Sequence, residues 1–142
     1  MNQLHNLSIA DMRARLDAGD VTAQQLTEAV LTQIKAHDAV IGAYLHVDTD
    51  GALAAAQAAD ARIRAGERGD MLGIPLGIKD VLSTQGLPTT ASSKVLQGYR
   101  PPYDATAVAR LKQAGAVLLG KLNCDEFAMG SSTENSAYQL TR

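Results

Sequence analysis

The sequence has one cysteine, no tryptophan, and only four Tyr and one Phe among its 142 residues. The single thiol of Cys124 excludes an internal disulfide and suits a reducing compartment, so we expect a cytoplasmic protein. Thirteen Lys and Arg residues are scattered, and the net charge of -2 gives no electrostatic case for direct nucleic-acid binding. No apolar run approaches the ~20 residues of a membrane span, and the N-terminus does not resemble a signal peptide. Because aromatic residues are so few, the core must be built from Ala, Leu, Val and Ile.

Residues 1–69 carry mostly helical signals. A capping pattern begins each of three expected helices, at Ser8, at Thr22 and within residues 48–50. Between the second and third helices, residues 41–47 form a short, apolar, β-prone run that predicts a strand.

Residues 70–142 are expected to hold strands and loops. In order, they predict a buried strand at 72–81, a long polar loop at 83–102, a helix begun by Asp104, an apolar strand at 116–119 and a return towards helix at 121–127. Alternation of helix and strand indicates an α/β fold with helices packed on a largely buried sheet. No linker or repeat separates the two parts, so we treat residues 1–142 as one domain portion.

Lys79 is the residue whose setting most suggests chemistry. Apolar residues and glycines precede it in residues 72–78, so we expect its amine to enter a poorly hydrated interior. An ammonium is costly there, and lysines so placed can act as bases. The alternative is a strand-end lysine that reaches solvent or pairs with Asp80. The residues around Lys79 alone support a catalytic base and a strand-end lysine equally well.

Other motifs argue against a metal or nucleotide site. Residues 115–121 imitate the Gly-x4-Gly-Lys pattern of a P-loop, but Leu122 stands where a magnesium-binding Ser or Thr belongs, and the intervening residues form an apolar strand instead of a flexible cradle. His5, His37 and His46 lack the spacing of zinc ligands. We predict no metal in this chain.

The segment from 124 to 136 offers weaker candidates. Cys124 stands next to acids, which would raise the pKa of a thiol, so a small filler or half-exposed thiol is favoured over a nucleophile. Asp125 and Glu126 are interpreted as first-turn acids that favour a helix dipole. Residues 130–136 are small and polar; they form either a surface loop or part of a pocket for a small polar substrate.

Several segments taken together resemble the amidase signature family. They are Gly-Ile-Pro-Leu-Gly-Ile-Lys-Asp at 73–80, Thr-Thr-Ala-Ser-Ser at 89–93, Pro-Pro-Tyr-Asp-Ala-Thr at 101–106, residues 115–123, and Asp-Glu-Phe-Ala-Met-Gly-Ser-Ser-Thr-Glu-Asn-Ser-Ala-Tyr at 125–138. The last segment is the most discriminating and is similar to the glutaminase subunits of tRNA-dependent amidotransferases. The strong match spans residues 72–138, so the fold implied is the N-terminal part of an amidase, with an incomplete mixed sheet.

The resemblance implies a Ser–cis-Ser–Lys mechanism in which Lys79 is the general base and both serines lie beyond Arg142. Gly130 and Ser131 would border the pocket for glutamine. Implied partners are the B and C subunits of the amidotransferase; the B subunit would use ATP and magnesium and contact most of the charged tRNA, while this chain needs no cofactor. Residues 1–142 alone are expected to be inactive, and either self-associating or only marginally stable. A stand-alone amidase and a non-catalytic assembly module remain alternatives.

Overall fold

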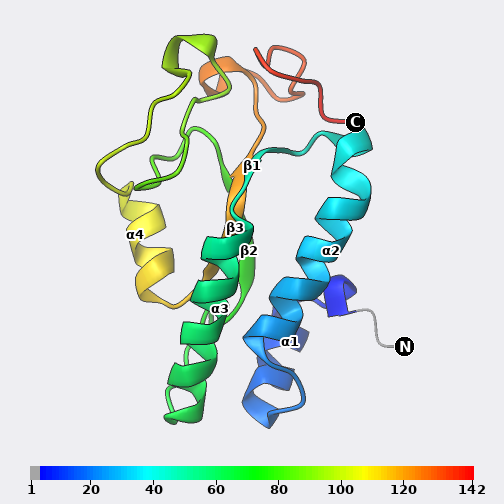
Figure 1. Ribbon diagram of the computed structural model, residues 1–142, viewed down its shortest axis with the longest axis vertical. Coiled ribbons are helices and arrows are strands. Elements are labelled where there is room, and N and C mark those ends of the chain that lie inside the picture. Colours follow the sequence, from blue (N-terminus) through cyan, green and yellow to red (C-terminus); the bar gives the residue numbers. More distant parts are fainter. Residues whose placement is uncertain (1–3) are drawn as a thin grey trace.

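A computed structural model of the protein, which describes residues 4–142, shows helices packed around a small mixed sheet (Figure 1). Its elements are η1 (Leu4–Asn6), α1 (Ile9–Ala18), α2 (Ala23–Ile41), β1 (Tyr44–Val47), α3 (Thr49–Arg64), β2 (Pro75–Lys79), η2 (Lys94–Leu96), α4 (Thr106–Gln113), β3 (Val117–Leu122) and η3 (Glu126–Ala128). The predicted α/β class is confirmed.

The sheet is ordered β1-β3-β2, so the apolar strand β3 lies in the centre. It is antiparallel to β1 and parallel to β2, with Ile78 opposite Lys121 and Lys79 opposite Leu122. Because β2 and β3 are parallel, both finish at the same end of the sheet. Figure 1 shows the loops that follow them gathered at that end. Functional side chains carried by these loops are therefore brought together.

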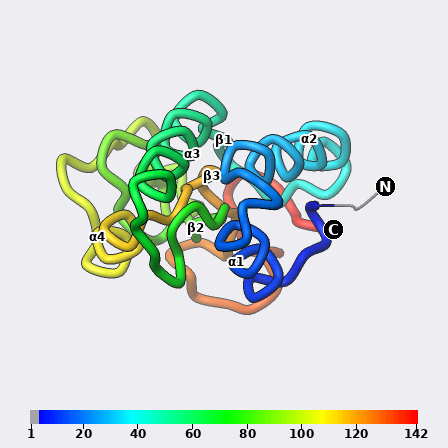
Figure 2. Tube along the Cα trace, turned by 90° about the horizontal axis from the view of Figure 1, so that it is seen from below, coloured from blue at the N-terminus to red at the C-terminus, as the bar shows by residue number. Residues whose placement is uncertain are grey.

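The two faces of the sheet are covered by different helices. Val117 and Leu119 of β3 belong to the main core, in which Ala52 and Ala56 let α3 approach the sheet closely. Leu118 points to the opposite face, where it packs with Ile78 and with Val108 of α4. Seen along the sheet, α2 and α3 lie together on one side and α4 lies apart from them (Figure 2).

The helix starts agree with the predicted caps. The hydroxyl of Ser8 accepts from the backbone N–H of Asp11, and Thr22 forms a complete capping box with Gln25. The carboxylate of Asp48 begins α3. Within residues 4–142, no helix has the length and apolar character needed to cross a membrane.

Two predicted strands differ in their bounds. Helix α2 continues to Ile41, and the strand predicted for 41–47 starts only at Tyr44 because Gly42, with a φ of +69°, ends the helix in the left-handed conformation. The strand predicted for 72–81 is confined to Pro75–Lys79. Proline at the first position of an edge strand removes no ladder hydrogen bond.

Two predictions for the second half are wrong. Asp104 does not cap α4, whose N-cap is Ala105; instead the Asp104 carboxylate accepts from the Gln85 N–H (2.7 Å) and pairs with Lys112 (2.8 Å). Residues 121–127 do not return to a regular helix. Strand β3 continues to Leu122 because it pairs on both sides, and only the short turn η3 follows.

Candidate functional site

The loop-covered end of the sheet holds Lys79, the last residue of β2, and its side chain is exposed. The expectation of a dry, buried amine is wrong for these 142 residues. Ile78 packs beneath α4, and because neighbouring residues of a strand point to opposite faces, Lys79 points away from that core. No residue among 4–142 hydrogen-bonds its amine, and Asp80 pairs with another lysine. The Lys79 amine is therefore free to meet a ligand.

A hollow of about 190 Å³ lies beside Lys79. It is lined by Lys79, Asn123, Cys124, Asp125, Gly130, Ser131, Ser132 and Thr133. The structure thus brings together the candidate base and the two candidate pocket residues, Gly130 and Ser131, although they are some 50 positions apart in the sequence. All three are exposed at its rim.

The wall formed by residues 130–136 is shaped by Asp125, which is buried (2% exposed). Its carboxylate accepts from the backbone N–H groups of Asn135 (2.9 Å), Ser132 (3.0 Å) and Thr133 (3.2 Å). These bonds, that of Asn135 first, hold the pKa of Asp125 below its ordinary value. The interpretation of Asp125 as a helix-dipole acid is wrong: the side chain makes no capping bond and organises a loop.

Gly130 completes this arrangement. A Cβ at this position would lie 2.5 Å from the Asp125 carboxylate, so a side chain larger than hydrogen would force the loop away. The close approach of the Gly130 backbone to Asp125 explains why a glycine precedes the serine pair.

Directly behind Lys79 lies Asp80, which is 1% exposed. Its carboxylate accepts from Thr90 through both the backbone N–H (3.0 Å) and the hydroxyl (2.5 Å), and from the backbone N–H of Ser92 (3.2 Å). It also pairs with the ammonium of Lys121 at 3.4 Å. Asp80 thus ties the end of β2 to β3 and to the loop that carries residues 89–93.

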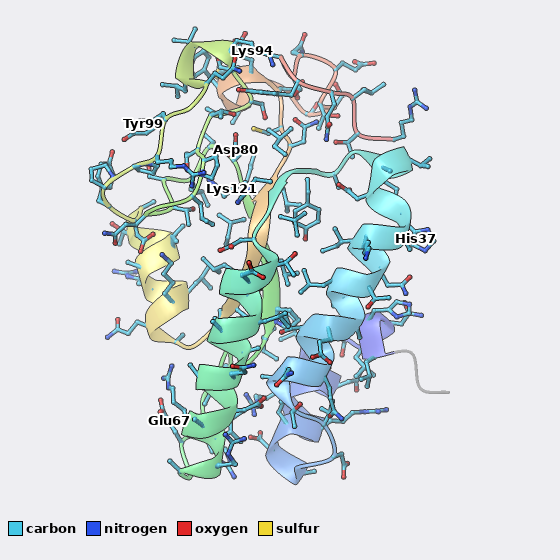
Figure 3. All side chains as sticks on the ribbon, in the orientation of Figure 1. His37, Glu67, Asp80, Lys94, Tyr99 and Lys121 are labelled. Atoms are coloured by element: carbon cyan, nitrogen blue, oxygen red, sulfur yellow. The ribbon has the colours of Figure 1, made fainter. Side chains whose placement is uncertain are left out.

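Lys121 is fully buried and its amine is saturated. Besides Asp80, it donates to the carbonyl of Leu82 (2.9 Å) and the hydroxyl of Thr89 (2.8 Å). Burial lowers its pKa, while the Asp80 carboxylate acts in the opposite direction. Figure 3 shows Asp80 and Lys121 adjacent beneath the loops. Sequence reasoning missed this pair, although a lysine inside the apolar run 116–122 was a signal that the cation needs a buried partner.

Cys124 is buried (4% exposed), which confirms the interpretation of a small filler. Its backbone N–H donates to the Ser92 hydroxyl (3.0 Å), and that hydroxyl donates to the side-chain oxygen of Asn123 (3.2 Å). The loop from 89 to 93 is thereby joined to the floor of the hollow beside Lys79.

Backbone strain is concentrated around this hollow. The described non-glycine residues with positive φ are Ala91, Ser92, Phe127, Ala128 and Thr133, all in the two loops that follow β2 and β3. Strained conformations of this kind persist only where surrounding bonds over-determine them, and they cluster at functional sites. Here the bonds to Asp80 and Asp125 supply that constraint.

The metal and nucleotide motifs gain no support. Among residues 4–142 no group of three His, Cys, Asp or Glu side chains is placed to hold a metal ion. The residues between Gly115 and Lys121 lie mostly in strand β3, which confirms the apolar strand predicted there.

Comparison with known proteins shows the family. The family model described as Amidase matches residues 25–142. The chain belongs to the amidase family. The resemblance drawn from residues 72–138 is therefore confirmed, and so is the assignment of the fold to the N-terminal part of such proteins.

Curated relatives are more specific. The chain is 61% identical over 142 residues to the A subunit of glutamyl-tRNA(Gln) amidotransferase from Roseiflexus sp. (strain RS-1), covering 100% of this chain and 29% of that protein. It is 59% identical to the protein of the same name from Chloroflexus aurantiacus (strain ATCC 29366 / DSM 635 / J-10-fl), with coverage of 99% and 29%. The amidase chain described here thus spans about 29% of the length of these relatives.

Solved structures agree on the fold. The A subunit of glutamyl-tRNA(Gln) amidotransferase from Thermotoga maritima is 34% identical with a TM-score of 0.76, covering 100% of this chain and 28% of that chain. The peptide amidase of Stenotrophomonas maltophilia is 38% identical with a TM-score of 0.82, covering 91% and 27%. In both comparisons, this chain has the fold of only one part of the longer protein.

Proposed function

We propose that residues 1–142 are the lysine-bearing N-terminal portion of a glutamine amidohydrolase, the A subunit of a tRNA-dependent amidotransferase. The observation that carries the proposal is the shared hollow of Lys79, Gly130 and Ser131, found in a chain that is 61% identical to a protein of that name. The complete protein would supply ammonia for conversion of Glu-tRNA(Gln), and in some cases Asp-tRNA(Asn), to the amidated form.

In this proposal Lys79 is the general base. Its neutral amine takes a proton, through a bridging serine, from a second serine whose oxygen attacks the side-chain amide carbon of glutamine. An acyl-enzyme forms, ammonia leaves, and water then releases glutamate. Serine is a weak nucleophile at its own pKa and needs such a base. The Lys79 amine is accessible and has no hydrogen-bond partner among residues 4–142, as a group that must reach a substrate requires. In this proposal the portion of the protein that follows residue 142 covers the amine, and that burial favours its neutral form.

Both serines and the oxyanion-hole donors are proposed to lie in the portion of the longer protein that follows residue 142. Phe127 and Met129, which come just before the lining residue Gly130 in the sequence, are 48% and 80% exposed, and further chain would cover these apolar side chains. Without nucleophile and oxyanion hole, the acyl-enzyme cannot form, so residues 1–142 alone are expected to be inactive.

Partners and cofactors follow from the same proposal. The B subunit would receive the ammonia, bind most of the charged tRNA and use ATP and magnesium, while the C subunit would brace the assembly in the cytoplasm. This chain would itself use no cofactor.

A stand-alone amidase is the second candidate, supported by the 38% identity to a peptide amidase. The 61% identity to an amidotransferase subunit favours the first. Formation of a complex with the B and C subunits separates the two candidates, because a stand-alone amidase would form none.

The decisive experiment uses a complete protein in which residues 1–142 are followed by the remaining sequence of the Roseiflexus relative, assembled with the B and C subunits. Glutamine hydrolysis is measured for the unchanged protein and for Lys79→Ala. We expect a loss of at least ~10²-fold, the low end for removal of a general base.

Lys35→Ala removes another exposed lysine, which lies on α2 and does not line the hollow; it is the matched control and should leave hydrolysis unchanged. Full activity of Lys79→Ala would contradict the proposal and favour a non-catalytic assembly module. Glutaminase activity of pure residues 1–142 would contradict the division of the active site.

A further inference from the structure

The side chain of the residue that follows the proposed base is held by several partners at once. Asp80 accepts from two donors of Thr90 and one of Ser92, and it faces the ammonium of Lys121. A buried carboxylate with so many partners cannot shift without leaving several of them unpaired, and each unpaired buried group is costly.

The backbone on both sides of Asp80 is also fixed. Its N–H donates to the carbonyl of Leu122 on β3 (2.8 Å), and its own carbonyl accepts from Ala91 (3.2 Å). The Cα of Lys79 therefore stands between the β2–β3 ladder and a residue that is anchored through both its backbone and its side chain. Only the flexible stem of Lys79 remains free to move.

The same contacts continue to the opposite wall of the hollow. Ala91 and Ser92 adopt positive φ, and the carbonyl of Ala91 accepts from the N–H of Phe127 (2.8 Å). The Ser92 hydroxyl contacts Asn123 and Cys124, which line the hollow together with Lys79. Asp80 thus fixes both the origin of the Lys79 side chain and the surface that it faces.

Asp80 and Lys121 do not take part in proton transfer themselves. Their exposed fractions are 1% and 0%, both sets of polar atoms are engaged, and by strand alternation they leave the sheet on the face opposite to Lys79. Asp80 also borders a second hollow together with Thr90, but its carboxylate is already engaged by Thr90, Ser92 and Lys121.

We propose that Asp80, neutralised by Lys121, is a positioning residue that sets the direction of Lys79 towards the substrate hollow. The inference rests on the proposed function, in which Lys79 is the base. A displaced base slows proton transfer without weakening the binding of substrate, because misplacement by about 1 Å can cost ~10²-fold in rate.

The test uses the complete protein assembled with the B and C subunits and compares Asp80→Asn, Lys121→Met and Thr90→Val. Steady-state glutamine hydrolysis gives kcat and KM, and circular dichroism gives the folded fraction by which kcat is corrected. For Asp80→Asn we expect kcat to fall about 10- to 100-fold with KM within about twofold, since only transition-state geometry is lost. Lys121→Met and Thr90→Val should lower kcat by smaller factors, again with little change in KM.

Asp60→Asn is the matched control. Asp60 of α3 is also a buried aspartate (7% exposed), and its carboxylate accepts two backbone N–H groups, those of Ala23 and Gln24 at the start of α2. It should lower thermal stability and leave kcat per folded molecule unchanged. If Asp80→Asn does not fold, Thr90→Val decides, because it removes one hydroxyl bond and keeps the shape of the side chain.

Unchanged kcat per folded molecule in all three variants, while Lys79→Ala is inactive, would overturn the positioning role and leave the proposed function intact. An active Lys79→Ala would instead overturn the proposed function. A rise in KM with unchanged kcat would also overturn the inference, since it would place Asp80 in substrate binding.

Discussion

Lys79 and Lys121 lie at the same end of two neighbouring parallel strands, yet their environments are opposite. Lys121 is fully buried and donates to a carbonyl, a hydroxyl and a carboxylate. Lys79 is exposed and has no partner for its amine among residues 4–142. Because Ile78 is opposite Lys121 and side chains alternate, the two lysines leave the sheet on opposite faces.

The two environments separate Lys121, which stabilises the fold, from Lys79, whose amine is accessible to a ligand. The ammonium of Lys121 is neutralised by Asp80, and each of its hydrogen bonds satisfies a buried group. These contacts stabilise the folded chain and leave no N–H group of Lys121 free. A general base must keep a lone pair available within reach of a substrate. Of the two lysines, only Lys79 has an amine that a substrate in the hollow could reach, which is why the proposed function assigns the base to it.

The largest expected effect on stability comes from breaking the buried pair. In residues 1–142, Lys121→Met should lower the free energy of unfolding by about 3–5 kcal/mol, because Asp80 is left as an uncompensated buried charge. Lys79→Met should change it by less than about 0.5 kcal/mol, as for other exposed side chains. Urea unfolding followed by circular dichroism measures both.

These measurements should be made at two protein concentrations. In the sheet of the described residues, ordered β1-β3-β2, the outer edge of strand β2 is unpaired, and we expect residues 1–142 to self-associate or to be marginally stable. A concentration-dependent midpoint would show self-association. Equal destabilisation by the two lysine variants would contradict the comparison.

Removing both members of the pair sharpens the comparison. Asp80→Asn combined with Lys121→Met should be at least ~1 kcal/mol more stable than the sum of the two single changes predicts, because no charge is then left buried without a partner. A double-mutant cycle by urea unfolding gives this coupling energy. Strict additivity would mean that the 3.4 Å contact between Asp80 and Lys121 is energetically unimportant.

A smaller effect concerns the wall that faces Lys79. Since backbone N–H groups hold the pKa of Asp125 below the ordinary value of 3.8, its carboxylate stabilises the fold above that value. This contribution is lost as the pH falls through the lowered pKa. Hydrogen exchange should therefore show the amides of Ser132, Thr133 and Asn135 losing protection in acid. In Asp125→Asn their protection should be weaker and should no longer depend on this titration.

The smallest expected effect belongs to a third lysine. Lys94 lies over the ring of Tyr138, with its amine 3.8 Å from the ring centroid. Its amine thus has one weak partner, whereas that of Lys79 has none among residues 4–142 and that of Lys121 has three. Lys94→Met should cost about 0.5–1 kcal/mol, the range for an exposed cation–π contact. Thermal unfolding compared with Tyr138→Leu tests it, because the two changes should not add if the contact is real.

Much of the helical part was predictable because its signals are local. The caps at Ser8, Thr22 and Asp48 use hydrogen bonds that join residues three positions apart, so they can be read from the sequence. The bounds of β1 and β2 were less accurate. The helix end at Gly42 is a local glycine cap that the strand prediction for 41–47 did not use, whereas the strand start at Pro75 depends on pairing with β3.

The site was predicted in part. The motif residues Lys79, Gly130 and Ser131 do line one hollow. The burial of Lys79 was predicted wrongly, because flanking apolar residues do not reveal which face of a strand a side chain takes. The roles of Asp80 and Asp125 could not be predicted. Their loop partners lie up to 12 positions away without regular periodicity, and Lys121, the ion-pair partner of Asp80, lies 41 positions away on another strand.

The most direct test of the distinction between the two lysines measures activity and stability on the same pair of variants. Lys79→Met and Lys121→Met are made in the complete protein with its partners, and glutamine hydrolysis per folded molecule is compared with thermal stability. We expect Lys79→Met to lose at least ~10²-fold in activity at unchanged stability, and Lys121→Met to lose mainly stability. A stable but inactive Lys121→Met beside an active Lys79→Met would contradict the account and assign the base to the buried lysine.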